Sequence, residues 1–273
     1  ETWADELMGK FGIGLTHIPT EWWDELWPLR PSLPREEAEI QPLPLAGESC
    51  ADKLARIRKA IGEKTLIVSA LDDIAWTLNL RGTDVHCNPV VVSYLIITPD
   101  EAHFFALPEK ISSSVEEYLR ENNVAVHPYA DFYRMVATFD TYPLVLPTNS
   151  NVEISTRCQR LTDEGRCTFA PSPIPARKAI KNEAETEGFR KAMVRDGIAL
   201  VRFLIWLEEK MERGEEVTEL SADRELTRQR STQALFRDIS FDTIAGYGTH
   251  GAIVHYEPTP ESDIPLEPRG LLL

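Results

Sequence analysis

The sequence predicts a mixed α/β protein, in which a mixed β-sheet with flanking helices is followed by a more helical segment. Helical and strand patterns alternate from about residue 50 to residue 175. The proline-rich stretch APSPIPARK at 170–178 then marks a change of composition. A long helical pattern begins near Asn182, where a continuing alternation would place another strand. Together these observations predict an α/β domain joined to a second, partly helical one.

Charge and composition exclude some classes of partner. The 273 residues contain 29 Lys and Arg against 44 Asp and Glu, a formal net charge of -15. Because nucleic-acid binding depends on neutralising phosphates, this balance argues against a nucleic-acid partner. No apolar run approaches the roughly 18 residues that a membrane span needs, so no membrane partner is expected.

The cysteines bear on the cellular compartment of the protein, and the first residue bears on whether the sequence is a fragment. The four cysteines show no Cys-x-x-Cys spacing, so we expect free thiols in a reducing, cytoplasmic compartment. The chain begins with Glu1 rather than Met, and no signal-peptide pattern is visible. We therefore expect a fragment that begins inside a longer protein.

The first 45 residues contain a short helix and a linker. Thr20 is expected to cap a helix over IPTEWWDELW, with acidic residues in its first turn. The prolines of 28–46 end this helix and indicate a semi-rigid linker. The tryptophans of residues 1–27 are expected to pack at a helix end, with ligand stacking as the alternative.

Two helices are expected in the α/β region. ADKLARIRKAI places Leu54, Ile57 and Ile61 on one face, and Gly62 is positioned as its stop. Ser113 and Glu116 have the spacing of a capping box at the start of a second helix.

Strands are expected between and after these helices. The runs are TLIVS, VVVSYLIIT, AHFFAL, VAVHPY, YPLVLP and CTFAP. The second run is almost continuously apolar, as a strand covered on both faces requires. AHFFAL is expected to form a hairpin with it across Pro99 and Asp100. The sheet should therefore lie between two layers of helices.

The region after 178 begins with a long helix that ends at Gly214. Its apolar stripe at helical spacing is expected to consist of Phe189, Met193, Gly197, Leu200, Leu204, Leu207 and Met211. Thr218 is expected to cap a second, more polar helix. LFRDISFDTIAG, GAIVHY and the terminal GLLL have strand-like patterns.

Three segments resemble the three-domain Xaa-Pro aminopeptidases, also called aminopeptidase P. SALDDIAWTLNLRGTDVHCNPVVVSYLIIT is similar to their middle domain. IKNEAETEGFRKAMVRDGIALVRFLIWLEE and FDTIAGYGTHGAIVHYEPTP are similar to the opening of their catalytic domain. The resemblance implies three parts: the end of a first creatinase-like domain with its linker at 1–45, a second creatinase/prolidase-type domain at 46–176, and the first third of a "pita-bread" metallopeptidase domain at 177–273.

The resemblance also implies a function for the intact protein. Such enzymes bind two divalent metals, usually manganese, and are commonly cytosolic homodimers. A metal-activated water attacks the bond between an N-terminal residue and a following proline, since a two-metal cluster generates hydroxide near neutral pH. A prolidase or creatinase, or a non-catalytic binding or dimerisation relative, stays an alternative.

The ligand set of that metal site lies outside this chain by the same resemblance. The family uses two aspartates, a histidine and two glutamates, and the first aspartate would fall two positions beyond Leu273. No metal ligand and no catalytic residue is therefore expected within the chain, which by itself is expected to be inactive and metal-free.

Two residues are carried over as candidates for substrate binding. His255 matches the histidine that faces substrate in the family; the alternative is a histidine satisfied within a strand. Arg81 is either a buried arginine that fixes a loop by hydrogen bonds, for example to carbonyl groups, or a ligand for a substrate or partner carboxylate. His250 is expected at the loop surface. The nearby glycines are expected to permit positive φ and close backbone approach, because the spacing of a phosphate-binding loop is missing.

Overall fold

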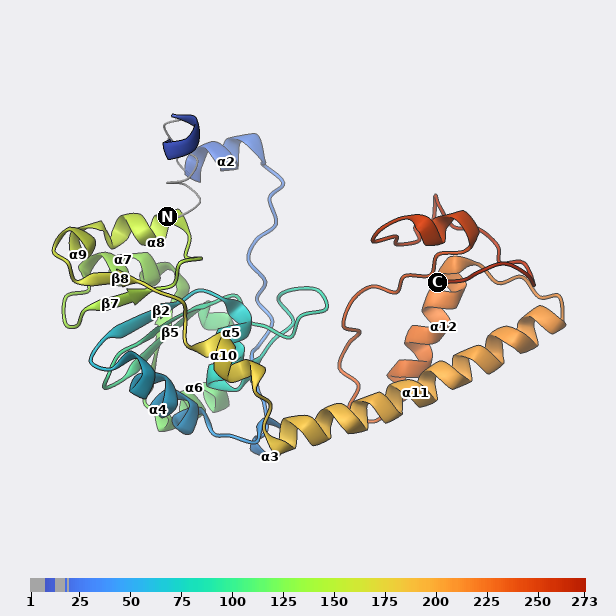
Figure 1. The fold of residues 1–273 in the computed structure, drawn as a ribbon, viewed down its shortest axis with the longest axis horizontal. Helices are drawn as coiled ribbons and strands as arrows, with labels where there is room; N and C mark the ends of the chain where they lie inside the picture. Colours follow the sequence, from blue (N-terminus) through green and yellow to red (C-terminus); the bar gives the residue numbers. More distant parts are fainter. Residues whose placement is uncertain (1–7, 13–17, 19) are drawn as a thin grey trace. The chain divides into compact units, whose positions relative to one another are not determined.

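The computed structural model describes residues 8–12, 18 and 20–273 (Figure 1). The chain forms two compact units, Glu1–Asn182 and Glu183–Leu273. Part of the predicted first-domain remnant, including Trp3, lies outside the described residues. Helix α2 (Thr20–Leu26) forms where it was predicted.

The expected packing of the tryptophans is wrong for the three that are described. Trp22, Trp23 and Trp27 are 58%, 47% and 55% exposed. Within the described residues, a seven-residue helix followed by a segment without regular structure leaves these rings largely exposed.

Unit 1 is built on a six-stranded mixed sheet in the order β6-β5-β4-β2-β7-β8. Its strands are β2 (Thr65–Val68), β4 (Tyr94–Ile97), β5 (Ala102–Ala106), β6 (Val124–Pro128), β7 (Leu144–Leu146) and β8 (Cys167–Phe169). Strand β4 runs antiparallel to β2 and β5, and the other pairs are parallel. All six predicted strands and the β4–β5 hairpin are confirmed. Strand β4 begins later than VVVSYLIIT suggests, because the Val92 N–H donates to the Asp84 carboxylate at 2.5 Å.

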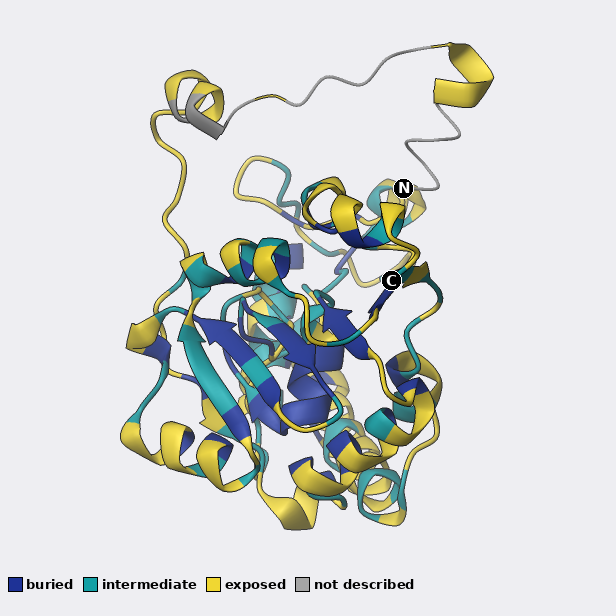
Figure 2. Ribbon diagram, turned by 90° about the vertical axis from the view of Figure 1, so that its left-hand side faces the viewer, coloured by how far each residue is buried: buried dark blue, intermediate teal, exposed yellow. Residues whose placement is uncertain are grey.

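Helices cover both faces of this sheet, as its apolar strands predict (Figure 2). The helices of unit 1 after α2 are α3 (Leu43–Ala46), α4 (Cys50–Ile61), α5 (Leu71–Leu78), α6 (Ser113–Glu121), α7 (Phe132–Thr138), α8 (Val152–Arg157), α9 (Gln159–Asp163) and α10 (Ile174–Ala179). Leu66 and Val68 face a core shared with α4, α5, α6 and Ile174 of α10. Ile67 faces a second core, shared with α7, α8 and α9. A small second sheet pairs β1 (Glu39–Ile40) with β3 (Leu80–Arg81).

The helix ends largely follow the sequence signals. Ser49 Oγ accepts the Asp52 N–H at the start of α4, and Gly62 ends that helix with φ 64°. Helix α6 begins one residue earlier than expected, because Ser112 and not Ser113 is its N-cap. The four cysteines, all among the described residues, form no disulfide bond with one another.

A buried ion pair joins two segments of unit 1. Lys110 Nζ lies 2.5 Å from Asp84 Oδ1, and the two side chains are 0% and 1% exposed. Lys110 Nζ also donates to the Glu36 carbonyl at 3.4 Å. The pair therefore fixes the loop after β3 against the 3-10 turn at Pro108–Lys110.

Four tyrosines of unit 1 have a raised pKa: Tyr142, whose hydroxyl contacts the Asp100 carboxylate, and three others for which burial is the main cause. Burial is the main cause that raises the pKa of Tyr94, Tyr118 and Tyr133 to about 12. The unfolded value is about 10, so the neutral hydroxyls stabilise the fold fully below pH about 10. That stabilisation is lost as pH rises through about 12. A tyrosinate absorbance titration should therefore show a late phase that is missing in urea.

The same titration on Tyr133→Phe should reduce the late phase. Tyr133 and Tyr94 share a hydroxyl contact of 3.0 Å, so the variant also leaves Tyr94 with one partner fewer. A wild-type curve with a single phase centred near pH 10 would contradict burial of these hydroxyls.

Unit 2 contains α11 (Glu183–Glu212), α12 (Glu219–Ser231) and the 3-10 helix η3 (Gly248–Ala252). The two predicted helices are confirmed, and Thr218 caps α12 through a capping box with Ser221. None of the helices in the described part of the chain has the length and apolar character needed to cross a membrane.

The predicted apolar stripe of α11 is exposed over most of its length. Phe189, Met193 and Leu204 are 57%, 64% and 49% exposed. The buried side chains of α11 are Ala199 and Phe203, because α12 packs on that face and forms a small core with it. Leu207 and Met211 of the predicted stripe pack against this core, so helical spacing identified the C-terminal part of this face.

The strand-like patterns after α12 do not form regular strands among the described residues. GAIVHY instead begins within η3 and continues as a turn. The terminal GLLL contributes a single antiparallel bridge, between Leu272 and Tyr247, and no longer strand. A strand needs a partner over several consecutive residues, and here the pairing stops after one.

Candidate functional site

The segment from Gly246 to Tyr256 is anchored on one buried carboxylate. Glu219, the first residue of α12, is 0% exposed. It accepts the backbone N–H of Tyr247 at 2.6 Å and the hydroxyl of Tyr256 at 2.6 Å. His250 Nδ1 lies 3.0 Å from each of its oxygens. Three points of the segment, 28 to 37 residues further along the chain, thus converge on one side chain.

The surroundings of Glu219 can stabilise a buried negative charge. A buried charge is costly unless several donors surround it, and Glu219 has three donor residues. It also stands at the N-terminus of α12, where the helix dipole favours negative charge. Burial, and then the contact with Glu219, raise the pKa of Tyr256, so its hydroxyl stays a donor at neutral pH.

The glycines of the segment have the geometry predicted for them. A Cβ on Gly246 would lie 3.0 Å from the Cα and N of Gly251, which real Cβ atoms rarely approach. Gly248 has φ 57°, in the left-handed region. The anion bound by this turn is the protein's own carboxylate of Glu219.

His255 lies directly before the anchored Tyr256 and is exposed. Its φ is 56°, a left-handed value that is uncommon for a residue other than glycine. It lies in a turn and not in a strand. A neutral imidazole can donate from one nitrogen and accept at the other, so the turn presents a ring able to hold a polar group. The predicted contact of His255 with substrate stays a prediction.

Arg81 belongs to β3 in unit 1 and is half-buried. Its Nη1 donates to the carbonyls of Ala75 at 2.9 Å and Leu80 at 2.8 Å. These bonds connect β3 to α5. They agree with the first of the two alternatives from the sequence, an arginine that fixes a loop by hydrogen bonds to carbonyl groups. A role in binding a carboxylate stays a prediction.

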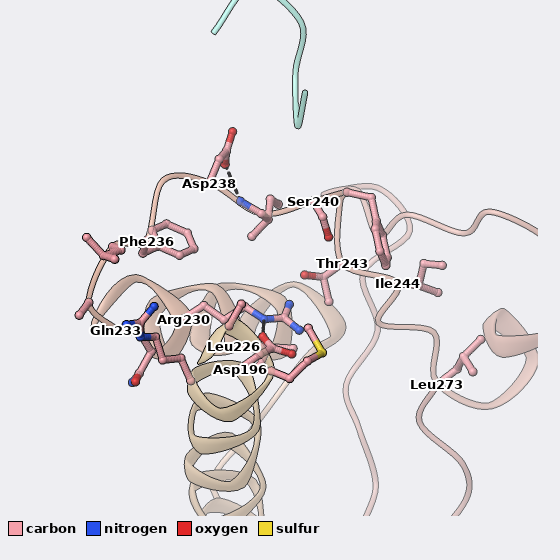
Figure 3. A pocket seen from close by; sticks show the side chains of 17 residues that line it. Asp196, Leu226, Arg230, Gln233, Phe236, Asp238, Ser240, Thr243, Ile244 and Leu273 are labelled. Atoms are coloured by element: carbon pink, nitrogen blue, oxygen red, sulfur yellow. Dashed lines mark hydrogen bonds and ion pairs between the residues drawn. The ribbon is translucent and has the colours of Figure 1, made fainter. Parts of the chain in front are cut away.

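A cavity of about 690 Å³ lies within unit 2, between α11, α12 and the chain from Gln233 to Ile244 (Figure 3). An ion pair between Arg230 Nε and Asp196 Oδ1, at 2.7 Å, joins α12 to α11 beside it. Its lining is otherwise mainly apolar. The sequence predicted neither this cavity nor a role for its residues.

The anchored segment by itself does not fit a dinuclear metal centre. Both oxygens of Glu219 already accept hydrogen bonds, and His250 is engaged with them. Only His255 offers an outward-facing ring in this segment. The residues present therefore serve to shape and orient, and no metal step is assigned to them.

Sequence reasoning missed Glu219 and misplaced His250. His250 was expected at the loop surface, but its side chain is 22% exposed and contacts a fully buried carboxylate. The available signal was an acidic residue directly after the capping Thr218, which is also what an ordinary helix N-terminus carries. Its partners lie too far along the chain for any local pattern to indicate them.

Family models match almost all of the described chain. Residues 29–185 match the creatinase/prolidase N-terminal domain, and residues 187–273 match metallopeptidase family M24. The first match alone covers more than half of the chain.

Relatives and solved structures agree with these matches. A probable Xaa-Pro aminopeptidase P of Sordaria macrospora is 35% identical over 99% of this chain and 47% of its own length. Aminopeptidase P2 of Arabidopsis thaliana is 35% identical over 98% of this chain and 41% of its own length. The crystal structure of X-prolyl aminopeptidase from Caenorhabditis elegans, described as a cytosolic enzyme with a di-nuclear active site, superposes with a TM-score of 0.87 at 30% identity, over 93% of this chain and 43% of that one.

The chain thus spans less than half the length of these relatives. The predicted resemblance and the mixed α/β fold class are confirmed. The chain belongs to the creatinase/prolidase N-terminal domain family, and its residues 187–273 match the model of metallopeptidase family M24.

Proposed function

We propose that the protein to which this chain belongs is a metal-dependent aminopeptidase that releases the N-terminal residue from peptides with proline in second position. The observation that carries this proposal is the match along the whole chain, including the His255 segment, to proteins named Xaa-Pro aminopeptidase. The structural similarity to the C. elegans enzyme supports it.

Within this function the chain contributes one wall of the substrate site. Glu219 holds Tyr256 and η3 in place, and the turn between them presents His255. The His255 ring would then hold a polar group of the peptide near the bond to be cleaved, by donating or accepting one hydrogen bond. Arg81 is a second, independent proposal for contact with a carboxylate.

The remaining features are proposals by the same similarity. We propose two divalent metals, preferably manganese, supplied with ligands from outside the described segment. We also propose a cytosolic homodimer, and the division of the chain at residues 45 and 176 into the end of a first domain, a second domain and the start of the catalytic domain.

The test uses full-length protein with Mn²⁺ on an Xaa-Pro-Xaa peptide and a matched Xaa-Ala-Xaa peptide. We expect cleavage of the first only, at the bond before proline. Equal cleavage of both peptides, or of neither, would reject the proposed function.

His255→Ala should lower kcat/KM on the Xaa-Pro-Xaa peptide roughly 100-fold, the typical effect of losing one well-placed hydrogen bond at a reacting group. Metal content, measured by elemental analysis, should not change. Val254→Ala is the matched control, because Val254 is the neighbouring residue and is 83% exposed. If His255→Ala has wild-type kinetics, His255 does not contact substrate. That result would not bear on the proposed aminopeptidase activity of the protein.

A further inference from the structure

Two histidines lie side by side on adjacent parallel strands of unit 1. His103 belongs to β5 and His127 to β6, in a register that pairs His103 with Ala125 and Phe105 with His127. His103 Nδ1 and His127 Nε2 are 3.1 Å apart. This pair is on the sheet of unit 1 and is separate from the His255 segment of unit 2.

We propose that His103 and His127 form a binding site for one divalent transition-metal ion of the zinc, nickel or copper class. Nitrogens 3.1 Å apart subtend about 95° at an ion placed about 2.1 Å from each. That angle is within reach of tetrahedral or square-planar coordination after a small rotation of either ring. Imidazole is a preferred ligand of these ions, and water completes the coordination.

The Glu101 carboxylate lies beside the nitrogen of His103 that would not bind the ion. Glu101 Oε1 lies 3.4 Å from His103 Nε2, the nitrogen that faces away from His127. Histidines that bind a metal through one nitrogen usually donate the other N–H to a carboxylate or carbonyl, which fixes the tautomer and the ring. A proton on Nε2, the nitrogen beside the Glu101 carboxylate, would therefore leave the lone pair of His103 Nδ1 to bind the ion.

The surroundings keep the pair ordered and accessible. Phe105 stacks on the His127 ring at 5.0 Å between centroids and limits its rotation. The His103 side chain is 14% exposed and His127 is half-buried, so both rings are partly accessible to solvent.

The test is calorimetric titration of the metal-free 273-residue chain with Zn²⁺ and with Ni²⁺. We expect one high-affinity ion per chain. His103→Gln and His127→Gln should each weaken it tenfold or more, and Glu101→Gln should weaken it less. His255→Gln is the matched control, because it also removes one histidine but belongs to unit 2 and is exposed, and it should leave this affinity unchanged. Unchanged affinity in His127→Gln would overturn the proposal.

A second measurement uses the wild-type chain, so its result does not depend on whether the variants fold. In the NMR spectrum of the wild-type chain, Zn²⁺ should shift the ring resonances of His103 and His127 together at one equivalent. The resonances of His255 and His250 should not move at that point. A shift confined to other histidines, or no shift at all, would equally overturn the proposal.

Discussion

Lys110→Met should lower the free energy of unfolding of unit 1 by about 3–5 kcal/mol, the usual effect of removing one partner of a buried ion pair. Asp84 would keep its charge at 1% exposure, with only the Val92 N–H as a described partner at 2.5 Å. Burying that charge without its cation is what destabilises the fold. Urea unfolding of the whole chain, followed by circular dichroism, measures the change.

Two further variants separate charge from shape at this site. Lys110→Met combined with Asp84→Asn should recover most of the loss, because asparagine is neutral and still accepts the Val92 N–H. Arg35→Met removes the pair with Glu109, whose side chains are 67% and 47% exposed, and should cost less than about 1 kcal/mol. A Lys110→Met chain as stable as wild type would show that the ion pair is not buried in solution.

Glu219→Ala should release the segment from Gly246 to Tyr256 while α11 and α12 stay folded. The change leaves the Tyr247 N–H and the Tyr256 hydroxyl without their shared acceptor. Hydrogen bonds to a charged group contribute about 1.5–3 kcal/mol each, so we expect a local loss of about 3 kcal/mol. Amide exchange followed by mass spectrometry should then show roughly 100-fold faster exchange in this segment, since about 1.4 kcal/mol corresponds to a factor of ten.

Glu216→Ala is the control for this variant. Glu216 lies three residues earlier and is exposed, so its removal should leave exchange in the segment unchanged. Glu219→Gln should fall between the two, because an amide still accepts hydrogen bonds but carries no charge. Faster exchange throughout unit 2 in Glu219→Ala would mean that the carboxylate stabilises the whole unit and does not specifically hold the segment.

The sequence predicted those parts of the fold that are specified locally. Apolar runs located all six strands of the sheet, and capping signals located the end of α4 at Gly62 and the start of α12 at Thr218. At α6 the predicted cap was one residue off: the N-cap is Ser112, and the neighbouring Ser113 was predicted. Resemblance to a known family supplied the function, which no local pattern contained.

The parts that were missed depend on contacts between distant residues. Lys110 and Asp84 are 26 residues apart, and neither differs in sequence context from an ordinary surface charge. The buried face of α11 at Phe203 was decided by the position of α12 and not by helical spacing. For the same reason, alternating apolar residues in GAIVHY did not produce a strand where the neighbouring chain pairs at a single position.

The order of strands in unit 1 has a consequence during synthesis. Strand β7 pairs with β2 on one side and with β8 on the other, and Ile174 just after β8 is fully buried in the first core. A nascent chain that has not yet released residues 167–174 from the ribosome would therefore expose the hydrogen-bonding edge of β7, a surface that favours pairing with other chains. Chaperones that bind extended apolar segments should act on translation intermediates up to that length and dissociate soon after it, while most of unit 2 is still untranslated.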